Sequence, residues 1–404
     1  MKLFNSLGNK TETFNPPHSQ VVNIFTCGPS IYQKAHIGNF RTFLFEDILV
    51  RYLEYVGYRV KRGMNFTDIE GKAIDEAKKR KIDVERLTEE NIDEFLKEMH
   101  LLKMKIPEYL PKASESVGEA VQIIKLLVET GIAYWHRGNV YFDPLKFPGF
   151  GKLFGLDMTK WPRQKRRFHK DTYPGMQWNL GDFILWHGDE KRESVFWDTE
   201  IGRGRPAWNI QDPAMIRPYF RETLAIYCGG IDNLYRHHDY TLAVLESITN
   251  YPLAKFWLHG QHLSVNGQKM SKSKGNVYYT DTLLRQGYTA AEIRFFLIYG
   301  HYRTRLNYSP GAMVKATVKL RGLKNIISQI EKKTAGESKP DAKIARQIKE
   351  IFSAGMDSDL NVREALDGLH NMLSGLELSR LKADEASGIL AALREIDGVV
   401  QIIF

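Results

Sequence analysis

A lysine-rich loop near residue 270 carries side chains that could act on a phosphate. Its central sequence is Lys269-Met270-Ser271-Lys272-Ser273, in which ammonium groups alternate with small hydroxyl groups. Glycines at 267 and 275 allow the chain to turn tightly on either side. Ammonium, hydroxyl and backbone N–H groups brought together in this way can bind a polyphosphate. Without other evidence, however, a short Lys/Ser run is usually a solvated surface loop.

A second candidate phosphate element lies far upstream, at His36-Ile37-Gly38-Asn39. It follows an apolar run at 21–26 and precedes apolar residues at helical spacing over 40–55, so we expect it between a strand and a helix. The free N–H groups and partial positive charge of a helix N-terminus favour phosphates. Gly38 would allow a nucleotide to approach the backbone. The two elements together indicate a two-part ATP site.

The elements that must position these residues form a βαβ unit. We expect a strand at 21–26, a helix at 40–55 and a strand at 59–65, a pattern that favours a parallel sheet. Ligands bind at the carboxyl ends of the strands in such a sheet, which is where His36 is expected. Further helices are predicted at 75–104, 119–130, 289–299, 311–331, 341–380 and 384–399.

Residues 107–205 differ in character, and we expect them to form an insertion between two halves of the sheet. They include a Gly/Phe-rich loop at 147–156 and a basic cluster with interleaved aromatic side chains. The cluster consists of Lys160, Arg163, Lys165, Arg166, Arg167 and Lys170, with Trp161, Phe168 and Tyr173 among them. Arginines and aromatic rings together can hold a nucleic-acid strand, although a solvated loop would account for the same composition.

Composition excludes several classes of protein. The chain has 404 residues and a net charge of +9, which favours an anionic partner such as a nucleic acid or a nucleotide. It has two cysteines, Cys27 and Cys228, so a disulfide framework is not expected. The N-terminal segment lacks the apolar core of a secretory signal, and no apolar run is long enough to span a membrane. We therefore expect a cytoplasmic protein without a membrane partner.

Several short motifs together resemble the cysteinyl-tRNA synthetases, a family of class I aminoacyl-tRNA synthetases. Besides the two phosphate elements, the matching segments lie at 25–32, 65–69, 139–143, 151–153, 182–186, 204–208, 229–232, 237–238, 257–259, 301–303 and 359–361. The resemblance extends from about residue 20 to about residue 380. It implies an α/β fold in which a Rossmann-type parallel sheet is split by an α/β insertion and followed by a C-terminal α-helical bundle.

The same resemblance implies a domain order along the chain. Residues 1–106 would form the first half of the Rossmann domain, 107–205 the insertion, 206–263 the second half, 264–310 the segment with the lysine loop, and 311–404 the helical bundle. Many members of the family continue into a small anticodon-contacting domain, which we expect to be missing here. The chain also resembles in length a shortened relative that couples cysteine to the amine of an amino-sugar conjugate in mycothiol synthesis.

In this family an amino-acid carboxylate attacks the α-phosphate of ATP, a reaction that depends on positioning and charge neutralisation. The resemblance implies that His36 and Asn39 hold phosphate oxygens, and that Lys269 and Lys272 bind the departing pyrophosphate with Mg²⁺. The expected ATP-binding residues are Gly38, Gly229, Gly230, Asp232, Lys269, Met270, Ser271, Lys272 and Ser273. The expected contacts with the amino acid are Cys27, Thr67, Trp208, Asp212 and His237.

The sequence departs from the family at the zinc site that binds the substrate thiolate. The family's ligands are two cysteines, a histidine and a glutamate, and the corresponding residues here are Cys27, Asp212, His237 and Thr241. Three hypotheses stay open. Zinc is held by Cys27, Asp212 and His237, or Cys228 or Asp239 completes a rearranged site, or the metal is lost and Asp212 contacts a different side chain. We expect the zinc site to be weakened or lost, which would leave the activated amino acid undefined.

The leading hypothesis is ATP-dependent formation of an aminoacyl adenylate, followed by transfer of the amino acid to tRNA. One alternative is a paralogous ligase that transfers cysteine or another amino acid to a small-molecule amine. Another is a non-catalytic tRNA-binding relative. The presence of His36, Asn39, Lys269 and Lys272 disfavours this last alternative, because a binding module has no need to hold pyrophosphate.

Overall fold

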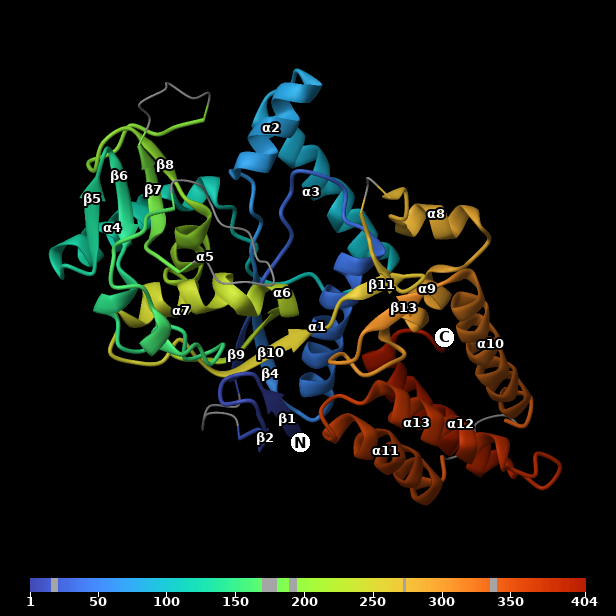
Figure 1. Cartoon of the computed structure of the whole chain (residues 1–404). Helices are drawn as coiled ribbons and strands as arrows, with labels where there is room; N and C mark the ends of the chain where they lie inside the picture. Colours follow the sequence, from blue (N-terminus) through green and yellow to red (C-terminus); the bar gives the residue numbers. More distant parts are fainter. Residues whose placement is uncertain (16–20, 169–179, 189–194, 272–273, 335–339) are drawn as a thin grey trace.

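A four-stranded parallel sheet forms the centre of the molecule (Figure 1). The computed structural model describes residues 1–15, 21–168, 180–188, 195–271, 274–334 and 340–404. The strands of the sheet lie in the order β10 (Ala254–Gly260), β9 (Leu224–Gly230), β3 (Val21–Thr26) and β4 (Arg59–Met64). Each strand runs parallel to its neighbours, and every residue of β9 is buried, as expected for a strand covered on both faces. The predicted parallel sheet is confirmed.

Helix α1 (Ile37–Tyr55) connects β3 to β4 and lies between the sheet and the C-terminal helices (Figure 1). Its buried residues occupy most of its circumference instead of a single stripe. This distribution follows from its neighbours, because α1 contacts both the strands of the sheet and the helices of the C-terminal part. The helix predicted at 40–55 is confirmed, and it begins earlier than the apolar periodicity indicated.

The charged segment predicted to be helical over 75–104 contains two helices. Helix α2 (Gly71–Arg80) ends at Lys81, which adopts the left-handed backbone conformation with φ of 57°. Helix α3 (Val84–Leu101) begins after a short connection. A left-handed residue ends an α-helix because it turns the chain away from the helix axis. Lysine is an uncommon residue in this conformation, so the interruption could not be read from composition.

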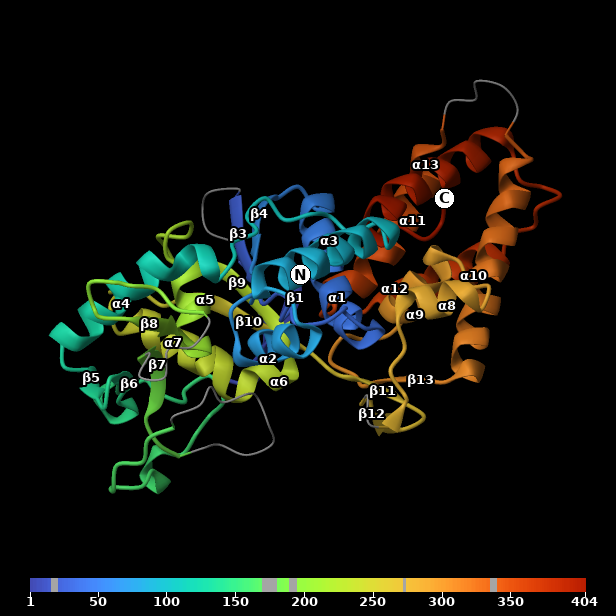
Figure 2. The ribbon, with the colours of Figure 1, turned by 90° about the horizontal axis from the view of Figure 1, so that it is seen from above.

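The chain between the two halves of the sheet forms a separate α/β lobe. Helix α4 (Val117–Glu129) precedes an antiparallel sheet with the order β5 (Ala133–His136), β6 (Asn139–Phe142), β7 (Phe183–Gly188) and β8 (Gly204–Pro206). Helix α5 (Trp208–Ile216) then leads to β9. Short helical turns lie at Ser114–Ser116, Pro144–Lys146 and Met158–Lys160. Figure 2 shows this lobe at one end of the elongated molecule, as expected for an insertion.

After β9 the chain winds continuously through three helical segments. They are α6 (Ile231–Asn233), a single π-helical turn (Leu234–His238) and α7 (Asp239–Glu246). The π-helical turn places His237 and His238 in the interior, where both are buried. Such turns are rare and are frequently found at functional sites.

The lysine loop begins as a β-hairpin. Strand β11 (Leu263–Val265) pairs with β12 (Gln268–Lys269), and the two connecting residues, Asn266 and Gly267, have φ of 48° and 77°. Asn-Gly is the preferred sequence for a two-residue hairpin turn with positive φ at both positions. Strand β13 (Leu306–Tyr308) pairs in parallel with β11, and helices α8 (Thr280–Arg285) and α9 (Ala290–Ile298) lie between β12 and β13 in the sequence.

The C-terminal part is a helical bundle at the other end of the molecule (Figure 2). It contains α10 (Pro310–Glu331), α11 (Ala342–Asp357), α12 (Val362–Ser374) and α13 (Ala383–Val400). Helices α11 and α12 approach closely at Gly355, where a Cβ atom would lie 2.4 Å from the backbone nitrogen of Ala365. The predicted bundle is confirmed. None of the described helices is long and apolar enough to cross a membrane.

A hairpin that the sequence analysis did not predict adds to the edge of the central sheet. It consists of β1 (Lys2–Asn5) and β2 (Lys10–Thr13). The Asn5 side chain donates to the backbone oxygen of Lys255 at 2.9 Å and accepts from the backbone N–H of Trp257 at 3.0 Å. These bonds hold the hairpin against β10, and they place Ser6 near the carboxyl end of that strand.

One buried arginine joins the bundle to the Rossmann domain. The guanidinium of Arg294 in α9 forms an ion pair with Asp47 of α1 at 2.6 Å, and both side chains are buried. Its other N–H groups donate to the backbone oxygens of Leu102 and Val400, each at 2.7 Å. A single side chain therefore holds together α1, α9, the segment after α3 and the end of α13.

Replacing this arginine should weaken the whole fold. We expect Arg294→Met to lower the free energy of unfolding by about 3–5 kcal/mol, because Asp47 stays buried without its main partner. Urea unfolding followed by circular dichroism measures the change. The matched control is Arg285→Met, which removes an arginine that is 70% exposed in its pair with Asp281 and should change stability by less than about 0.5 kcal/mol. Equal effects of the two variants would contradict the role of Arg294.

Candidate active site

The N-terminus of α1 is capped by the first residues of the expected phosphate element. His36 precedes the helix, and its Nδ1 accepts the backbone N–H of Asn39 at 3.2 Å. In return, Asn39 Oδ1 accepts the backbone N–H of His36 at 3.0 Å. This reciprocal capping box fixes both side chains at the positive end of the helix dipole. Because Nδ1 is an acceptor here, a neutral His36 ring carries its proton on Nε2.

The lysine loop lies directly against this N-terminus. A Cβ atom on Gly38 would lie 2.4 Å from Cε of Met270 and 3.1 Å from the His36 ring. The backbone N–H of Ile37 donates to the backbone oxygen of Tyr278 at 3.0 Å, so the chain beyond the loop is also bound to α1. The two phosphate elements, which are far apart in the sequence, are therefore adjacent.

Within the lysine loop, Asn276 fixes the backbone. Its side chain accepts the backbone N–H of Ser271 at 2.8 Å and donates to the backbone oxygen of Lys269 at 3.3 Å. Lys269 is exposed at the end of β12. Lys272 and Ser273, which the sequence analysis also assigned to the ATP site, lie outside the described residues.

The carboxyl end of β9 requires residues without a side chain. A Cβ atom on Gly229 would lie 2.6 Å from the His238 ring, and one on Gly230 would lie 2.6 Å from the carboxylate of Asp232. The second position also lies 3.8 Å from the hydroxyl of Thr42 in α1. Three of the expected ATP-binding residues, Gly229, Gly230 and Asp232, therefore lie together at the end of β9, and Gly230 lies near α1.

The expected amino-acid contacts are organised around the fully buried carboxylate of Asp212. Its Oδ1 accepts from the Asn65 amide at 3.1 Å, and its Oδ2 accepts from the Tyr227 hydroxyl and from His237 Nε2, each at 2.9 Å. The charge of this carboxylate also acts on the nearby Cys27 thiol. A carboxylate offers about four lone-pair positions, and these three donors occupy most of them.

Trp208 and Thr67 contact side chains that are bonded to this carboxylate. The indole of Trp208 stacks on the His237 ring, with 4.1 Å between centroids and 7° between planes. The Thr67 hydroxyl accepts from the Asn65 amide at 3.4 Å. The structure thus brings all the expected contacts into one group, and their binding to an amino acid stays a prediction. The group consists of Cys27, Thr67, Trp208, Asp212 and His237.

A chain of buried side chains connects this group to the N-terminal hairpin. His238 Nδ1 lies 2.8 Å from His259 Nε2, and His259 Nδ1 lies 2.7 Å from the hydroxyl oxygen of Ser6. Burial lowers the pKa of His238 well below its usual value and the pKa of His259 to about 3, so both rings are neutral near pH 7. Both histidines lie in segments that resemble the family, but the sequence predicts no role for them, because their contact depends on the hairpin and on the pairing of β9 with β10.

The family's zinc ligands, transferred to this chain, do not fit the observed geometry. Both oxygens of Asp212 are taken by hydrogen-bond donors. The Thr241 hydroxyl donates to the backbone oxygen of His237 at 2.9 Å, and a neutral hydroxyl is a poor zinc ligand. The set of Cys27, Asp212, His237 and Thr241 therefore does not form a zinc site.

Neither of the other candidate ligands lies in this group. The side chain of Cys228 packs on the α1 side of the sheet, where burial and then the carboxylate of Glu46 raise the pKa of its thiol. Asp239 accepts from the backbone N–H groups of Leu153 and Phe154 at 3.1 and 2.9 Å, which fixes a loop of the insertion. The hypothesis that Cys228 or Asp239 completes a rearranged metal site was wrong.

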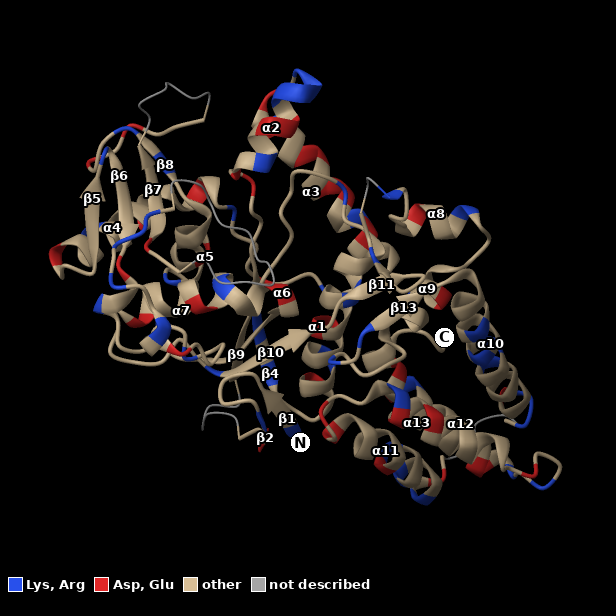
Figure 3. Cartoon of the chain, in the orientation of Figure 1, with Lys and Arg blue, Asp and Glu red and all other residues tan. Residues whose placement is uncertain are grey.

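The basic cluster of the insertion is partly neutralised by acidic neighbours. Lys165 lies 2.9 Å from a carboxylate oxygen of Asp143 and 3.7 Å from one of Asp182. Lys170 and Tyr173 lie outside the described residues. In Figure 3, Lys and Arg residues also lie along α10 and at the end of α2. The positive charge of the chain is thus distributed over several surfaces and is not concentrated in the insertion.

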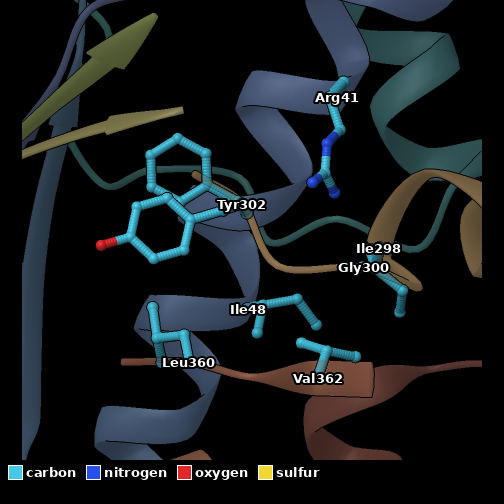
Figure 4. A pocket seen from close by; sticks show the side chains of 8 residues that line it. Arg41, Ile48, Ile298, Gly300, Tyr302, Leu360 and Val362 are labelled. Carbon is cyan, nitrogen blue, oxygen red and sulfur yellow. The ribbon is translucent and has the colours of Figure 1, made fainter. Parts of the chain in front are cut away.

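Arg41, in the first turns of α1, joins this helix to the chain at the end of α9. Its guanidinium donates to the backbone oxygens of Leu297 and His301, which binds α1 to the end of α9. Figure 4 shows the side chain beside a small cavity that Ile298 and Val362 also line. The cavity volume is about 10 Å³, which is room for about one water molecule, so this is not a nucleotide site.

Comparisons with known proteins match this chain to one family over nearly its whole length. Residues 13–318 match the family model described as tRNA synthetases class I (C) catalytic domain. The cysteine–tRNA ligase of Chlamydia pneumoniae is 35% identical over 410 residues, which cover 99% of this chain and 86% of that protein. The cysteine–tRNA ligase of Leptospira interrogans is 36% identical over 377 residues, which cover 91% of this chain and 78% of that protein.

The fold is similar to that of other solved synthetases. A methionyl-tRNA synthetase of Mycobacterium tuberculosis bound by methionyl-adenylate has a TM-score of 0.66 and 14% identity, with 96% of this chain and 92% of that chain covered. The LeuRS–tRNA–LeuAMS complex of Agrobacterium radiobacter has a TM-score of 0.65 and 12% identity, with 96% and 85% covered. At such identities the similarity shows the fold alone.

Asp212→Asn tests whether this carboxylate organises the group around it. The variant should lower the free energy of unfolding by about 1–3 kcal/mol, because an NH₂ group would face hydrogen-bond donors that now have an acceptor. Thermal or urea unfolding measures the loss. The control is Asp198→Asn, whose side chain is 76% exposed and whose removal should have little effect. If both variants unfold alike, Asp212 does not have this role.

Proposed function

Because the chain belongs to the cysteinyl-tRNA synthetase family, it is an amino-acid-activating ligase, and we propose that it uses ATP to form an aminoacyl adenylate and then transfers the amino acid to tRNA. The observation that best supports an ATP site in these particular residues is the contact between the N-terminus of α1 and the lysine loop. Met270 lies over Gly38, so both elements can act on the same triphosphate. A solvated surface loop would not need this contact.

In the proposed first step, a carboxylate oxygen of the amino acid attacks the α-phosphorus of ATP. The new O–P bond forms while the bond to the oxygen that bridges the α- and β-phosphates breaks, and pyrophosphate leaves with the bonding electrons. Negative charge therefore grows on the phosphate oxygens. In such a reaction, positioned donors and cations provide most of the catalysis.

The residues of the two phosphate elements have the chemistry that this step requires. His36, held as the tautomer with a proton on Nε2, would donate to a phosphate oxygen. Lys269 and Lys272 would neutralise the departing pyrophosphate. Mg²⁺, which enters with the nucleotide, supplies further positive charge at the phosphates when it is bound. Asn39 would keep His36 in place through the capping box as well as contact the nucleotide.

The surface at the end of β9 suits the nucleoside part of ATP. Gly229 and Gly230 lie at the carboxyl end of β9, the edge at which a parallel sheet binds its ligands, and Asp232 and His238 lie directly against them. Asp232, at the start of α6, offers a carboxylate that could accept hydrogen bonds from the ribose hydroxyls.

The charge of the chain supports tRNA as the acceptor. The net charge of +9 favours binding to a phosphate backbone. Helix α10 contains several basic residues along its length (Figure 3). They are Lys315, Lys319, Arg321 and Lys324, of which Lys319 pairs with Asp367 and Arg321 with Glu292. A small amine as acceptor would not need an extended basic surface.

Amino-acid-dependent exchange of labelled pyrophosphate into ATP tests activation, and charging of unfractionated tRNA tests transfer. We expect exchange with an amino acid and attachment of the same amino acid to tRNA. No exchange with any amino acid would contradict the enzymatic function. Exchange without tRNA charging would favour transfer to a small-molecule amine, which assays with candidate amines would then identify.

The variant His36→Asn separates the catalytic role of His36 from its capping role. Asparagine is a good N-cap residue, so it should keep the bond to the backbone N–H of Asn39 and leave the unfolding temperature unchanged. Its shorter side chain lacks the Nε2 donor, and the exchange rate should fall by about 10²–10³-fold. His100→Asn, which changes an exposed histidine at the end of α3, should alter neither property. If His36→Asn kept the full rate of pyrophosphate exchange, His36 would cap the helix and would have no catalytic role.

A further inference from the structure

A lysine outside both phosphate elements lies at the point where they meet. Lys34 is in the segment between β3 and α1, just before His36. Its ammonium nitrogen lies 2.9 Å from Oε1 of Glu94, 3.6 Å from Oε1 of Glu98 and 3.6 Å from Oδ2 of Asp281. The two glutamates belong to α3 and the aspartate to α8, so one ammonium group connects three parts of the chain.

Helix α3 is the firmly packed side of this arrangement. It contacts α1 through the ring of Phe95, which stacks on the ring of Phe40 with 5.7 Å between centroids. The Asn91 side chain donates to the backbone oxygen of Ile31 at 3.1 Å. Asn91 and the two glutamates are spaced at i, i+3 and i+7, so they lie on one face of the helix. This face therefore holds the segment that leads into α1 at both of its ends.

The start of α8 is the other side of the arrangement, and it follows the lysine loop closely in the sequence. The backbone oxygen of Tyr278 accepts the N–H of Ile37 at 3.0 Å, and α8, which contains Asp281, begins shortly after this bond. Lys34 therefore connects the same two segments as that backbone bond. Together the two contacts determine how closely the chain after the lysine loop approaches the N-terminus of α1.

The burial of Glu98 gives Lys34 an importance that a lysine in a surface ion pair would not have. The Glu98 side chain is 6% exposed, and its carboxylate oxygens have no hydrogen-bond partner among the residues that the structure describes. In the same part of the chain, Glu94 and Glu98 form ion pairs with Lys34 alone. Exposed ion pairs contribute little to stability, whereas a buried charge that loses its partner is strongly destabilising.

We propose that Lys34 is a positioning residue for the ATP site, because it holds the start of α8, and with it the lysine loop, against the N-terminus of α1. This inference rests on the proposed function, in which both elements act on the same triphosphate. Lys34 acts through the position of the loop, since three carboxylates already face its charge. Without it, Lys269 would move away from the departing pyrophosphate, and a shift of about 1 Å can lower a rate by about 10²-fold.

The ionisation of Glu98 gives this role a pH signature. Burial raises the pKa of Glu98 to about 7, while the charge of Lys34 acts to lower it. Glu98 is faced by Lys34 before α1, by Glu94 of α3, and by Thr280 and Asp281 of α8. Because its pKa in the folded protein is raised, the charging of Glu98 weakens the junction as the pH rises to 7 and above. Lys34 limits this loss, so its removal should have a larger effect at higher pH.

Hydrogen exchange of backbone amides tests the junction without depending on activity. At pH 8.5 the amide of Ile37 should exchange about 10-fold faster in Lys34→Met than in the unaltered protein, after correction for the intrinsic exchange rate. At pH 6, where Glu98 is neutral, the difference should be less than about 3-fold. Lys34→Arg keeps the positive charge and should retain most of the protection.

Lys349→Met is the matched control for the loss of a half-buried lysine. Its side chain is 36% exposed and pairs with Glu395 at 2.5 Å in the helical bundle, away from both phosphate elements. This variant should leave the exchange of the Ile37 amide unchanged at both pH values.

Pyrophosphate exchange gives the corresponding kinetic readout. For Lys34→Met at pH 8.5 we expect kcat to fall by about 10-fold, while KM for ATP changes by less than about 3-fold. KM for the amino acid should stay the same, because the group around Asp212 lies on the other face of β9. The double variant Lys34→Met/Glu98→Gln should recover most of the rate, because it has no buried charge at this position. A general loss of folding would not be reversed by a second substitution.

The possible outcomes separate this inference from the proposed function. Unaltered kcat and unaltered Ile37 protection in Lys34→Met at pH 8.5 would overturn the inference, and so would a double variant no better than Lys34→Met. If Lys34→Met does not fold, Glu98→Gln alone is decisive. It should abolish the loss of Ile37 protection between pH 6 and pH 8.5, and an unchanged loss would contradict the role. If the unaltered protein shows no pyrophosphate exchange, the proposed function fails, and hydrogen exchange still tests Lys34.

Discussion

The direct pairing of β3 with β9 is the constraint on which the candidate site depends. The two strands are separated in the sequence by the entire insertion, yet the backbone N–H of Cys27 donates to the backbone oxygen of Cys228 at 3.0 Å. In a parallel sheet the carboxyl ends of all strands meet at one edge, which is where such sheets bind ligands. That edge therefore collects residues from all four strands of the sheet. They are Cys27 after β3, Asn65 after β4, Gly229 and Gly230 in β9, and His259 in β10.

The two faces of the sheet divide this edge into two chemical environments. Successive side chains of a strand point to opposite faces, so Tyr227 reaches Asp212 on one face while Cys228 packs towards α1 on the other. The phosphate elements lie on the α1 side, and the buried carboxylate and the paired histidines lie on the opposite side.

Local sequence patterns predicted most of the long helices and the first two parallel strands, but few of the contacts between elements. Apolar periodicity and the expected βαβ unit gave β3, α1 and β4, and the Asn-Gly pair accounts for the hairpin at the start of the lysine loop. The interruption at Lys81 was missed because lysine seldom adopts the left-handed conformation. The N-terminal hairpin was missed because its strands are short and polar, and bonds to β10 hold it in place. Roles for Asn65, Tyr227 and His238 were missed because their partners come from distant segments.

The sequence by itself determined which chemical groups the protein has: the capping histidine, the lysines, and an aspartate and a threonine where the family has zinc ligands. Only the tertiary structure decided what these groups do. It placed Asp212 among donors from separate segments, turned Cys228 to the other face, and brought His238 beside Cys27. The physical reason is that residue type and periodicity are local properties. The partner of a buried polar group depends on strand order and on the packing of helices against the sheet, which no local pattern encodes.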